Sequence, residues 1–290
     1  MFNGALTALV TPFRDGEVDA PALRDLIEWQ IQSGIDGLVP CGSTGESATL
    51  THAEHDNVIK LTIEQTRKRV PVIAGTGSNS TAEAIRLTAA AREMGADGAL
   101  LLSPYYNKPT QDGIFRHYKT IAASVDLPLF VYNIPGRTAS NILPETVARL
   151  AEIKNIVGIK EASASMDQSS DILKMCGDRI TILSGDDALT VPLMALGAKG
   201  VISTCSNIVP REMHDLAAAA LAGDFAKARE IHYRLLPLIR GLFVETNPIC
   251  IKQAVAFMGK CANELRMPLV AMTAGPAEKL RIAMKELRLI

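Results

Sequence analysis

The sequence predicts an α/β protein of the (β/α)₈-barrel class that ends in a C-terminal helical extension. Eight short apolar runs recur along the chain, and helical patterns lie between them. The runs are spaced 19 to 35 residues apart, long enough for one parallel βα unit each, and are centred near Leu9, Leu38, Ile73, Leu101, Val131, Ile159, Leu183 and Ile202. The 290 residues also suit one closed barrel, which uses about 250 residues as a single domain.

The individual elements support this prediction. Runs such as 99–102 and 129–132 are continuously apolar, as expected of parallel strands covered on both faces. A capping box at 51–54 predicts a helix start, and Gly34 and Gly95 stand where helices should stop. An open doubly wound sheet is the alternative, but the nearest approach to a dinucleotide fingerprint, 75–80, lacks the third glycine.

The chain is expected to form one structural unit with two parts. Residues 1–222 contain the barrel, and residues 223–290 contain helices packed on it. The expected helices of this second part cover 224–240, 248–260 and 276–289.

Composition argues against several classes of protein. The net charge is −1 without a basic stripe, whereas nucleic-acid binders take their affinity from basic residues. No apolar segment reaches the about 20 residues of a membrane span, and the first residues lack a basic leader. Five scattered cysteines indicate reduced thiols and a cytoplasmic protein, and argue against a zinc site or a disulfide framework.

The chemistry is expected where the strands end, because the active sites of such barrels lie at that rim. Lys160 ends an apolar run, so burial can lower the pKa of its amine and make it a nucleophile towards a ketone. Tyr132 ends the preceding run and could pass protons. Taken alone, Lys160 could mark the solvent end of a strand and Tyr132 could be a core ring.

Two further groups suit carboxylates. The turn at 42–46 offers backbone N–H groups and the hydroxyls of Ser43 and Thr44, which fits a small carboxylate. Arg137 offers a planar fork for a second carboxylate. The purely structural alternatives are that 42–46 is only a tight βα turn and that Arg137 forms a surface ion pair.

Three motifs, Gly42-Ser43-Thr44-Gly45-Glu46, Tyr132-Asn133-Ile134-Pro135 and Gly158-Ile159-Lys160-Glu161, resemble the pyruvate-dependent Schiff-base lyases and synthases. The chain is most similar to the family of the 4-hydroxy-tetrahydrodipicolinate (dihydrodipicolinate) synthases. The likeness extends over essentially the whole chain, including 104–107, 183–187 and 243–248.

The resemblance implies that pyruvate condenses with aspartate 4-semialdehyde on the route through diaminopimelate to lysine. Lys160 would carry the pyruvate imine, without a metal or organic cofactor. The other implied roles are proton relay for Tyr132, Ser43 and Tyr106, the last reaching into a partner's site; pyruvate binding for Thr44, Ser43, Gly185 and Ile202; and aldehyde binding for Arg137. The family is usually a homotetramer, a dimer of dimers.

The substrate is not fixed by every motif. The synthases commonly carry Thr-Thr where this chain has Ser43-Thr44, and sialic acid lyases carry Ser-Thr. Arg137 favours the synthase, because sialic acid lyases and keto-deoxy-gluconate aldolases lack that arginine. Another pyruvate aldolase, or a catalytically idle barrel that senses a metabolite, remains the alternative.

The resemblance also implies feedback inhibition by lysine. Seven residues match the effector contacts of lysine-sensitive synthases, namely Ser47, Ala48, His52, His55, Asn79, Glu83 and Tyr105. Glu83 could bind the effector's α-ammonium, and Asn79 is expected on the same helical face. Tyr105 and Tyr106 are expected on an extended segment, with side chains on opposite sides. The bland alternative is that His52 and His55 are surface residues.

Overall fold

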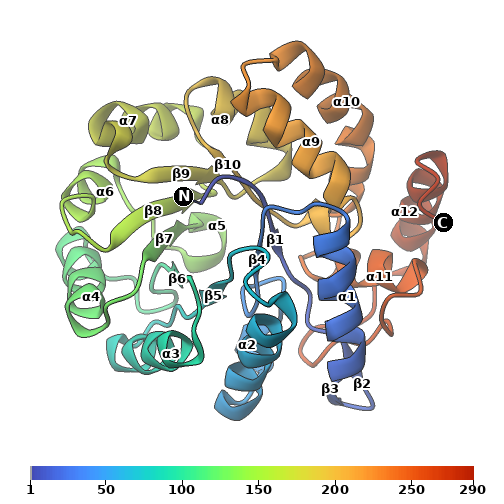
Figure 1. Ribbon diagram of the computed structural model, residues 1–290, viewed down its shortest axis with the longest axis horizontal. Helices are drawn as coiled ribbons and strands as arrows, with labels where there is room; N and C mark the ends of the chain where they lie inside the picture. The colour runs from blue at the N-terminus through green and yellow to red at the C-terminus, as the bar shows by residue number, and fades with distance from the viewer. Residues whose placement is uncertain (1) are drawn as a thin grey trace.

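A computed structural model describes residues 2–290 and contains the expected barrel (Figure 1). Its eight strands are parallel and hydrogen-bonded in the order β4-β1-β10-β9-β8-β7-β6-β5. A bridge between Leu38 and Val72 joins β4 to β5 and completes the circle. The strands are β1 Gly4–Ala8, β4 Gly37–Val39, β5 Ile73–Gly75, β6 Gly98–Leu102, β7 Leu129–Asn133, β8 Ile156–Glu161, β9 Thr181–Ser184 and β10 Gly200–Ser203. The predicted (β/α)₈ barrel is therefore confirmed.

Seven of the eight expected strand centres fall inside a strand, and Leu9 lies just after β1. Its backbone N–H still donates to Val39 O at 3.0 Å, so the chain continues along β4 beyond the regular strand. A short hairpin of β2 (Phe13–Arg14) and β3 (Glu17–Val18) then leads into the first helix.

Helices surround the strands on the outside (Figure 1). They are α1 Ala20–Gln32, α2 His52–Thr66, α3 Thr81–Met94, α4 Gln111–Ser124, α6 Pro144–Leu150, α7 Met166–Cys176, α8 Thr190–Ala195 and α9 Pro210–Leu221. The capping box is present, because Thr51 and Glu54 exchange side-chain and backbone hydrogen bonds at the start of α2. Gly95 ends α3 at φ 92°, a left-handed conformation that favours glycine.

Two apolar clusters explain why the strands read as continuous apolar runs. In β7, Phe130 and Tyr132 point into the barrel, whereas Leu129 and Val131 pack against the helices. Both faces of each strand are therefore buried. The inner cluster consists of Leu6, Ala8, Val39, Ile73, Leu100, Phe130, Tyr132, Leu183 and Ile202.

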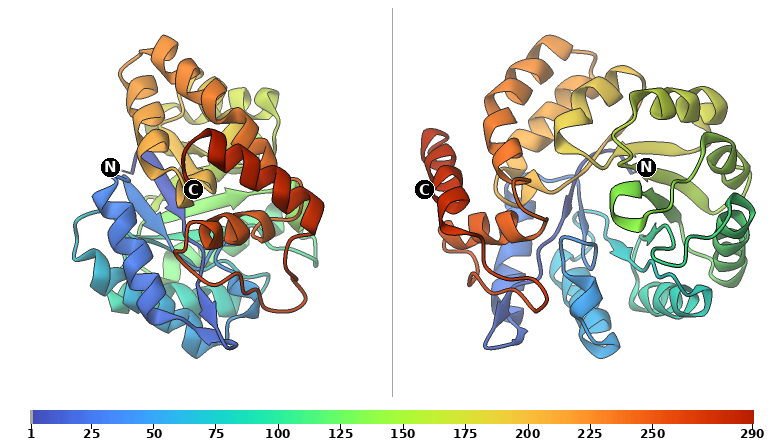
Figure 2. Two further views of the ribbon diagram at one scale, coloured as in Figure 1. Left: turned by 90° about the vertical axis from the view of Figure 1, so that its right-hand side faces the viewer. Right: turned by 180° about the vertical axis from the view of Figure 1, so that it is seen from behind.

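The last part of the chain is helical and lies against one side of the barrel. It contains α10 Phe225–Gly241, α11 Ile249–Phe257 and α12 Ala274–Glu286, close to the expected ranges. Figure 2 shows α12 at the outer edge of the molecule, where it packs against α10 and α11. Within residues 2–290, none of the helices has the length and apolar character needed to cross a membrane.

Candidate active site

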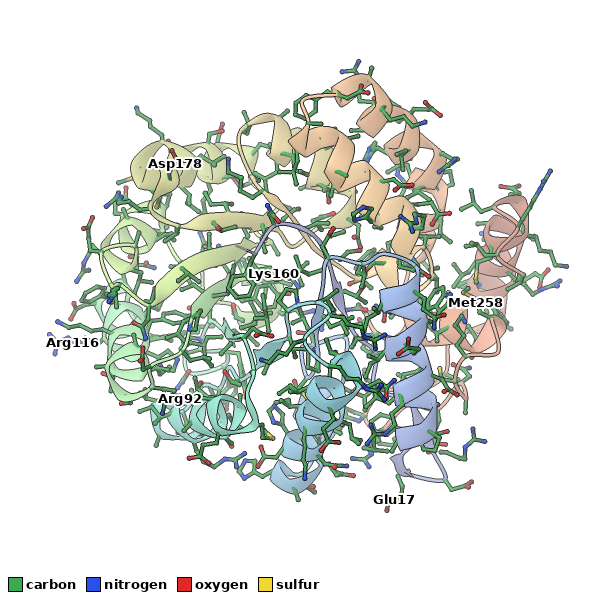
Figure 3. All side chains as sticks on the ribbon, in the orientation of Figure 1. Glu17, Arg92, Arg116, Lys160, Asp178 and Met258 are labelled. Carbon is green, nitrogen blue, oxygen red and sulfur yellow. The ribbon has the colours of Figure 1, made fainter. Side chains whose placement is uncertain are left out.

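A cavity of about 210 Å³ opens at the carboxyl ends of the strands. Its wall includes six of the eight residues expected to act in catalysis or substrate binding, namely Ser43, Thr44, Tyr132, Arg137, Lys160 and Gly185. Lys160 lies near the middle of the ring of strands (Figure 3). The sequence therefore brings most of the expected groups together at one point of the rim.

Lys160 and Tyr132 form the centre of this cavity. They are register neighbours on β8 and β7, and Lys160 Nζ lies 4.3 Å from the centroid of the Tyr132 ring. Both side chains are 6% exposed. The bland alternative for Lys160, a lysine at the solvent end of a strand, is therefore wrong.

Burial changes the acid–base behaviour of both groups. Desolvation lowers the pKa of Lys160 to about 8; the carboxylate of Asp187 opposes this shift and Arg137 adds to it. Roughly a tenth of such an amine is neutral at pH 7, against about 0.03% at an ordinary lysine pKa. Burial raises the pKa of Tyr132 to about 12, so its phenol keeps a proton that it can donate.

The turn after β4 is both a tight βα turn and a group of donors that could bind a carboxylate. It is a tight turn, in which Gly45 N donates to Gly42 O at 3.0 Å and Glu46 N donates to Ser43 O at 3.2 Å. The backbone N–H groups of Ser43 and Thr44 have no hydrogen-bond acceptor within residues 2–290. Two backbone donors and two hydroxyls thus stand at the cavity, which suits a carboxylate.

A buried ion pair holds this turn in place. Glu46 follows the turn in a left-handed conformation at φ 54°, and its carboxylate lies 2.8 Å from Lys252 Nζ. Lys252 belongs to α11 and also donates to Thr11 O at 2.6 Å. Both side chains are fully buried, so the C-terminal helices brace the turn that carries Ser43 and Thr44.

Asn247 joins the two groups expected to bind carboxylates. Its Nδ2 donates to Thr44 Oγ1 at 3.0 Å, which leaves the hydroxyl proton of Thr44 free to donate into the cavity. Its backbone oxygen accepts a hydrogen bond from Arg137 Nη2 at 2.7 Å. Arg137 itself stands on α5 (Pro135–Thr138), directly after β7.

Sequence reasoning assigned no role to Asn247 or Lys252. Neither residue ends a strand, because both lie after β10, the last strand of the chain. Asn247 stands within the 243–248 segment that resembles the family, and that likeness was the one available signal.

Two expected site residues are not part of the cavity wall. Ile202 is 1% exposed and packs in the inner cluster with Leu183 and Leu6, because β10 directs this side chain into the barrel. Tyr106 is 88% exposed at φ 72°. The extended segment expected at Tyr105 and Tyr106 is therefore wrong, since a left-handed residue turns the chain there.

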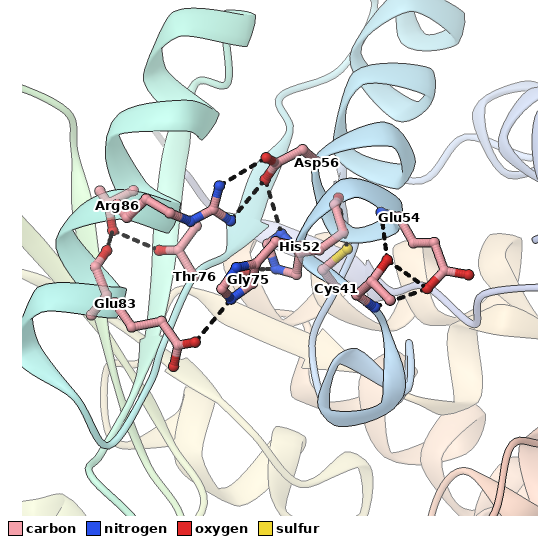
Figure 4. A network of polar contacts seen from close by, with 12 residues as sticks. Cys41, His52, Glu54, Asp56, Gly75, Thr76, Glu83 and Arg86 are labelled. Carbon is pink, nitrogen blue, oxygen red and sulfur yellow. Dashed lines mark hydrogen bonds and ion pairs between the residues drawn. The ribbon is translucent and has the colours of Figure 1, made fainter.

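A second cavity of about 460 Å³ lies beside the first. Its wall includes six of the seven residues expected to contact an effector, namely Ser47, Ala48, His52, His55, Glu83 and Tyr105. Figure 4 shows the contact between His52 and Glu83, whose Nε2 and Oε1 atoms are 2.9 Å apart. Hydrogen bonds from Ser78 and His52 lower the pKa of Glu83, so its carboxylate is charged at neutral pH.

Two expectations about this second cavity need correction. Asn79 does not share a helical face with Glu83, because Ser80 caps α3 and the helix begins at Thr81. Asn79 instead donates to Tyr105 O at 3.2 Å and holds that tyrosine's backbone. His55 is not a surface residue: it is 4% exposed, and its Nε2 lies 2.9 Å from Gly75 O.

The comparisons with known proteins agree with this geometry. Residues 1–287 match the model of the dihydrodipicolinate synthetase family. The 4-hydroxy-tetrahydrodipicolinate synthase of Syntrophus aciditrophicus is 59% identical over 290 residues, which is all of both chains.

Solved structures give the same result. The dihydrodipicolinate synthase of Acinetobacter baumannii, in complex with pyruvate, superposes with a TM-score of 0.99 at 45% identity and full coverage of both chains. The enzyme of Cyanidioschyzon merolae with lysine bound superposes with a TM-score of 0.97 at 40% identity, covering 100% of this chain and 99% of the other. The chain with Lys160 at the centre of its barrel belongs to the dihydrodipicolinate synthetase family.

Proposed function

We propose that this chain is a 4-hydroxy-tetrahydrodipicolinate synthase that condenses pyruvate with L-aspartate 4-semialdehyde through an imine on Lys160. The observation that carries the proposal is a buried lysine of lowered pKa, placed against Tyr132 in a cavity with two hydroxyls and an arginine. The relative from Syntrophus aciditrophicus is a 4-hydroxy-tetrahydrodipicolinate synthase, and the structure of the Acinetobacter baumannii relative is a complex with pyruvate.

The first half of the reaction forms an enamine. The neutral amine of Lys160 attacks the ketone carbon of pyruvate, and water leaves to give an iminium ion. The iminium withdraws electrons, so a methyl proton of pyruvate can pass to the water released in the previous step, and the enamine forms. Because this electron sink is made from pyruvate and the lysine, we propose that the reaction needs neither a metal nor an organic cofactor.

The second half forms the carbon–carbon bond. The enamine carbon attacks the aldehyde carbon, and the developing alkoxide takes a proton from Tyr132, which still carries one because the pKa of its phenol is about 12. The semialdehyde's own amine then attacks the iminium carbon and displaces Lys160, which closes a ring and restores the free amine. Ser43, beside Thr44 at the cavity, would relay the proton onward.

The remaining residues would bind substrate. Thr44 and Ser43 would hold the pyruvate carboxylate, and Gly185 leaves room for it beside Lys160. Arg137 would bind the carboxylate of the aldehyde by a charge-assisted pair. Its hydrogen bond to Asn247 O occupies Nη2, so the rest of the guanidinium is available.

The exposed Tyr106 and the second cavity support two further proposals, on assembly and on regulation. We propose a homo-oligomer, a dimer of dimers, in which the 88% exposed Tyr106 completes the relay of a neighbouring subunit. We also propose that L-lysine binds in the 460 Å³ cavity, where the charged Glu83 would receive its α-ammonium. The Cyanidioschyzon merolae relative binds lysine. The five free cysteines favour the cytoplasm.

A coupled assay tests the substrate. The purified protein should consume pyruvate and aspartate 4-semialdehyde, and Lys160→Ala should not. The same protein should leave sialic acid and 2-keto-3-deoxygluconate intact. A chelator should not change its activity on pyruvate and the semialdehyde, because the proposed reaction needs no metal. Cleavage of either sugar acid would favour another pyruvate aldolase, and no activity on any of these substrates would favour the metabolite sensor.

A further inference from the structure

Asp187 is a buried carboxylate that the proposed reaction has not yet used. It stands in the 3₁₀ turn Asp187–Leu189 after β9 and is 2% exposed. Its Oδ2 accepts the backbone N–H groups of Thr204 at 3.1 Å and Cys205 at 2.9 Å. Its Oδ1 has no hydrogen-bond partner within residues 2–290. Both of these donors are neutral backbone amides, and a buried carboxyl group with an unpartnered oxygen is unusual in a folded protein.

Asp187 lies beside the active-site cavity. Its neighbours line the active-site cavity: Gly185 and Asp186 precede it in the chain, and Thr204 donates a backbone hydrogen bond to it. Gly185 is packed against the Lys160 side chain, since a Cβ there would lie 3.0 Å from Lys160 Cε. Asp187 therefore lies two residues along the chain from the glycine that packs against Lys160, and it is hydrogen-bonded to a second residue of the cavity wall.

We propose that Asp187 is the counter-charge of the iminium ion formed on Lys160, a positioning residue that acts through the lysine without touching substrate. This inference rests on the proposed function. The reaction turns a neutral amine into a cation at a buried position, 6% exposed, where a nearby negative charge stabilises the cation more strongly than in water. The carboxylate forms and breaks no bond during the cycle.

The charged groups around the amine have opposing effects. Asp187 raises the pKa of Lys160, whereas Arg137 lowers it. Tyr132 is neutral throughout the working range, because burial raises the pKa of its phenol to about 12. Arg137 is required for the second substrate, yet its charge disfavours an iminium ion. Asp187 offsets that cost.

The groups that face Asp187 act on its own pKa in opposite directions. Burial raises its pKa, and the negative charge of Asp186 adds to this shift. Hydrogen bonds from the Ser203 hydroxyl and the two backbone amides offset part of this rise. The thiol of Cys205 remains neutral, because its pKa is raised well above the ordinary value by burial.

The test follows iminium formation across pH. Wild type, Asp187→Asn and Asp187→Ser are incubated with pyruvate and cyanoborohydride from pH 5.5 to about 9.5, and the adduct on Lys160 is quantified by mass spectrometry. The rate of trapping should follow a bell, limited at low pH by deprotonation of the amine and at high pH by protonation of the imine. Both neutral variants should move the whole bell towards acid by about one pH unit, because both cations lose the same counter-charge.

Two controls make the sign decisive. Arg137→Ala removes a positive charge and should move the bell towards alkali. Asp36→Asn also removes a carboxylate that accepts a backbone N–H, but at the amino-terminal end of the barrel, and should leave the bell in place. At saturating substrates near pH 8, Asp187→Asn should lower kcat about tenfold, which corresponds to one pH unit of lost stabilisation.

A purely structural role would lower the height of the bell without moving it. An unmoved bell in both Asp187 variants would therefore overturn the counter-charge. If wild type itself forms no adduct on Lys160, the proposed function fails before Asp187 is tested, so the two failures are distinguishable.

Discussion

Replacing Gly185 by alanine adds one methyl group at the point where the backbone after β9 passes the Lys160 side chain. The added Cβ would lie 2.6 Å from Ala162 Cβ, 3.0 Å from Lys160 Cε and 3.1 Å from Lys160 Cγ. Ordinary carbon–carbon contacts are about 3.5–4.0 Å, so the atoms around the new methyl group must move apart by roughly 1 Å. Ala162 has no flexible side chain to move, and therefore Lys160 or the backbone must shift.

The size of the effect follows from that displacement. Overpacking of a well-filled interior costs about 1–3 kcal/mol of unfolding free energy. The melting temperature should fall by roughly 2–4 °C for each kcal/mol. The effect on catalysis should be larger, because misplacing a reacting group by about 1 Å can cost about 100-fold in rate. We expect Gly185→Ala to fold and to lose about 100-fold in kcat.

The coupled assay and thermal unfolding measure both effects in one preparation. Gly275→Ala is the matched control, because a Cβ there meets nothing within 4 Å and the residue lies in α12, away from the cavity. It should keep full activity and gain about 0.4–1 kcal/mol of stability. Wild-type kcat in Gly185→Ala would show that Lys160 is not held against Gly185, and would refute the packing argument.

Four further outcomes are expected. Arg137→Ala should lose about 2–5 kcal/mol of transition-state binding and raise KM for the semialdehyde far more than for pyruvate; equal effects would indicate a general structural role. Mixed Tyr106→Phe and Lys160→Ala subunits, each inactive alone, should regain activity, because one site of each hybrid pair has both residues; no recovery after confirmed exchange would place Tyr106 in its own site. Millimolar lysine should inhibit wild type, and Glu83→Ala should stay active without inhibition; an enzyme indifferent to tens of millimolar lysine would refute the effector site. The pKa of Lys160 is lowered to about 8, so kcat/KM for pyruvate should rise with pH up to about pH 8 as the amine loses its proton, and a rise that continues towards pH 10 would contradict the lowered pKa.

The barrel and the centre of its site could be predicted because their signals are local. A parallel strand buried on both faces leaves a continuous apolar run, and the residue that ends the run lies at the functional rim. Lys160 and Tyr132 follow from this rule, and the structure places them side by side.

The remaining features depend on contacts between distant segments. Asn247 reaches Thr44 across 203 positions of the chain, and no pattern within either segment indicates that bond. The start of α3 at Thr81, after the Ser80 cap, moves Asn79 off the helix on which it was expected. Position along the inner face of a strand is not indicated by the pattern either: Ile202 shares the inner cluster with Ala8 and Tyr132, which line the cavity, but is not itself part of the cavity wall.

The most direct test of the account is the site of the pyruvate adduct. Borohydride added together with pyruvate should leave one covalent adduct per chain, and peptide mapping by mass spectrometry should place it on Lys160. Lys252, which is also buried, serves as an internal control, because its amine is already paired with Glu46 and should remain unmodified. An adduct on Lys160 alone agrees with the account, whereas an adduct on another lysine, or no adduct, would contradict it.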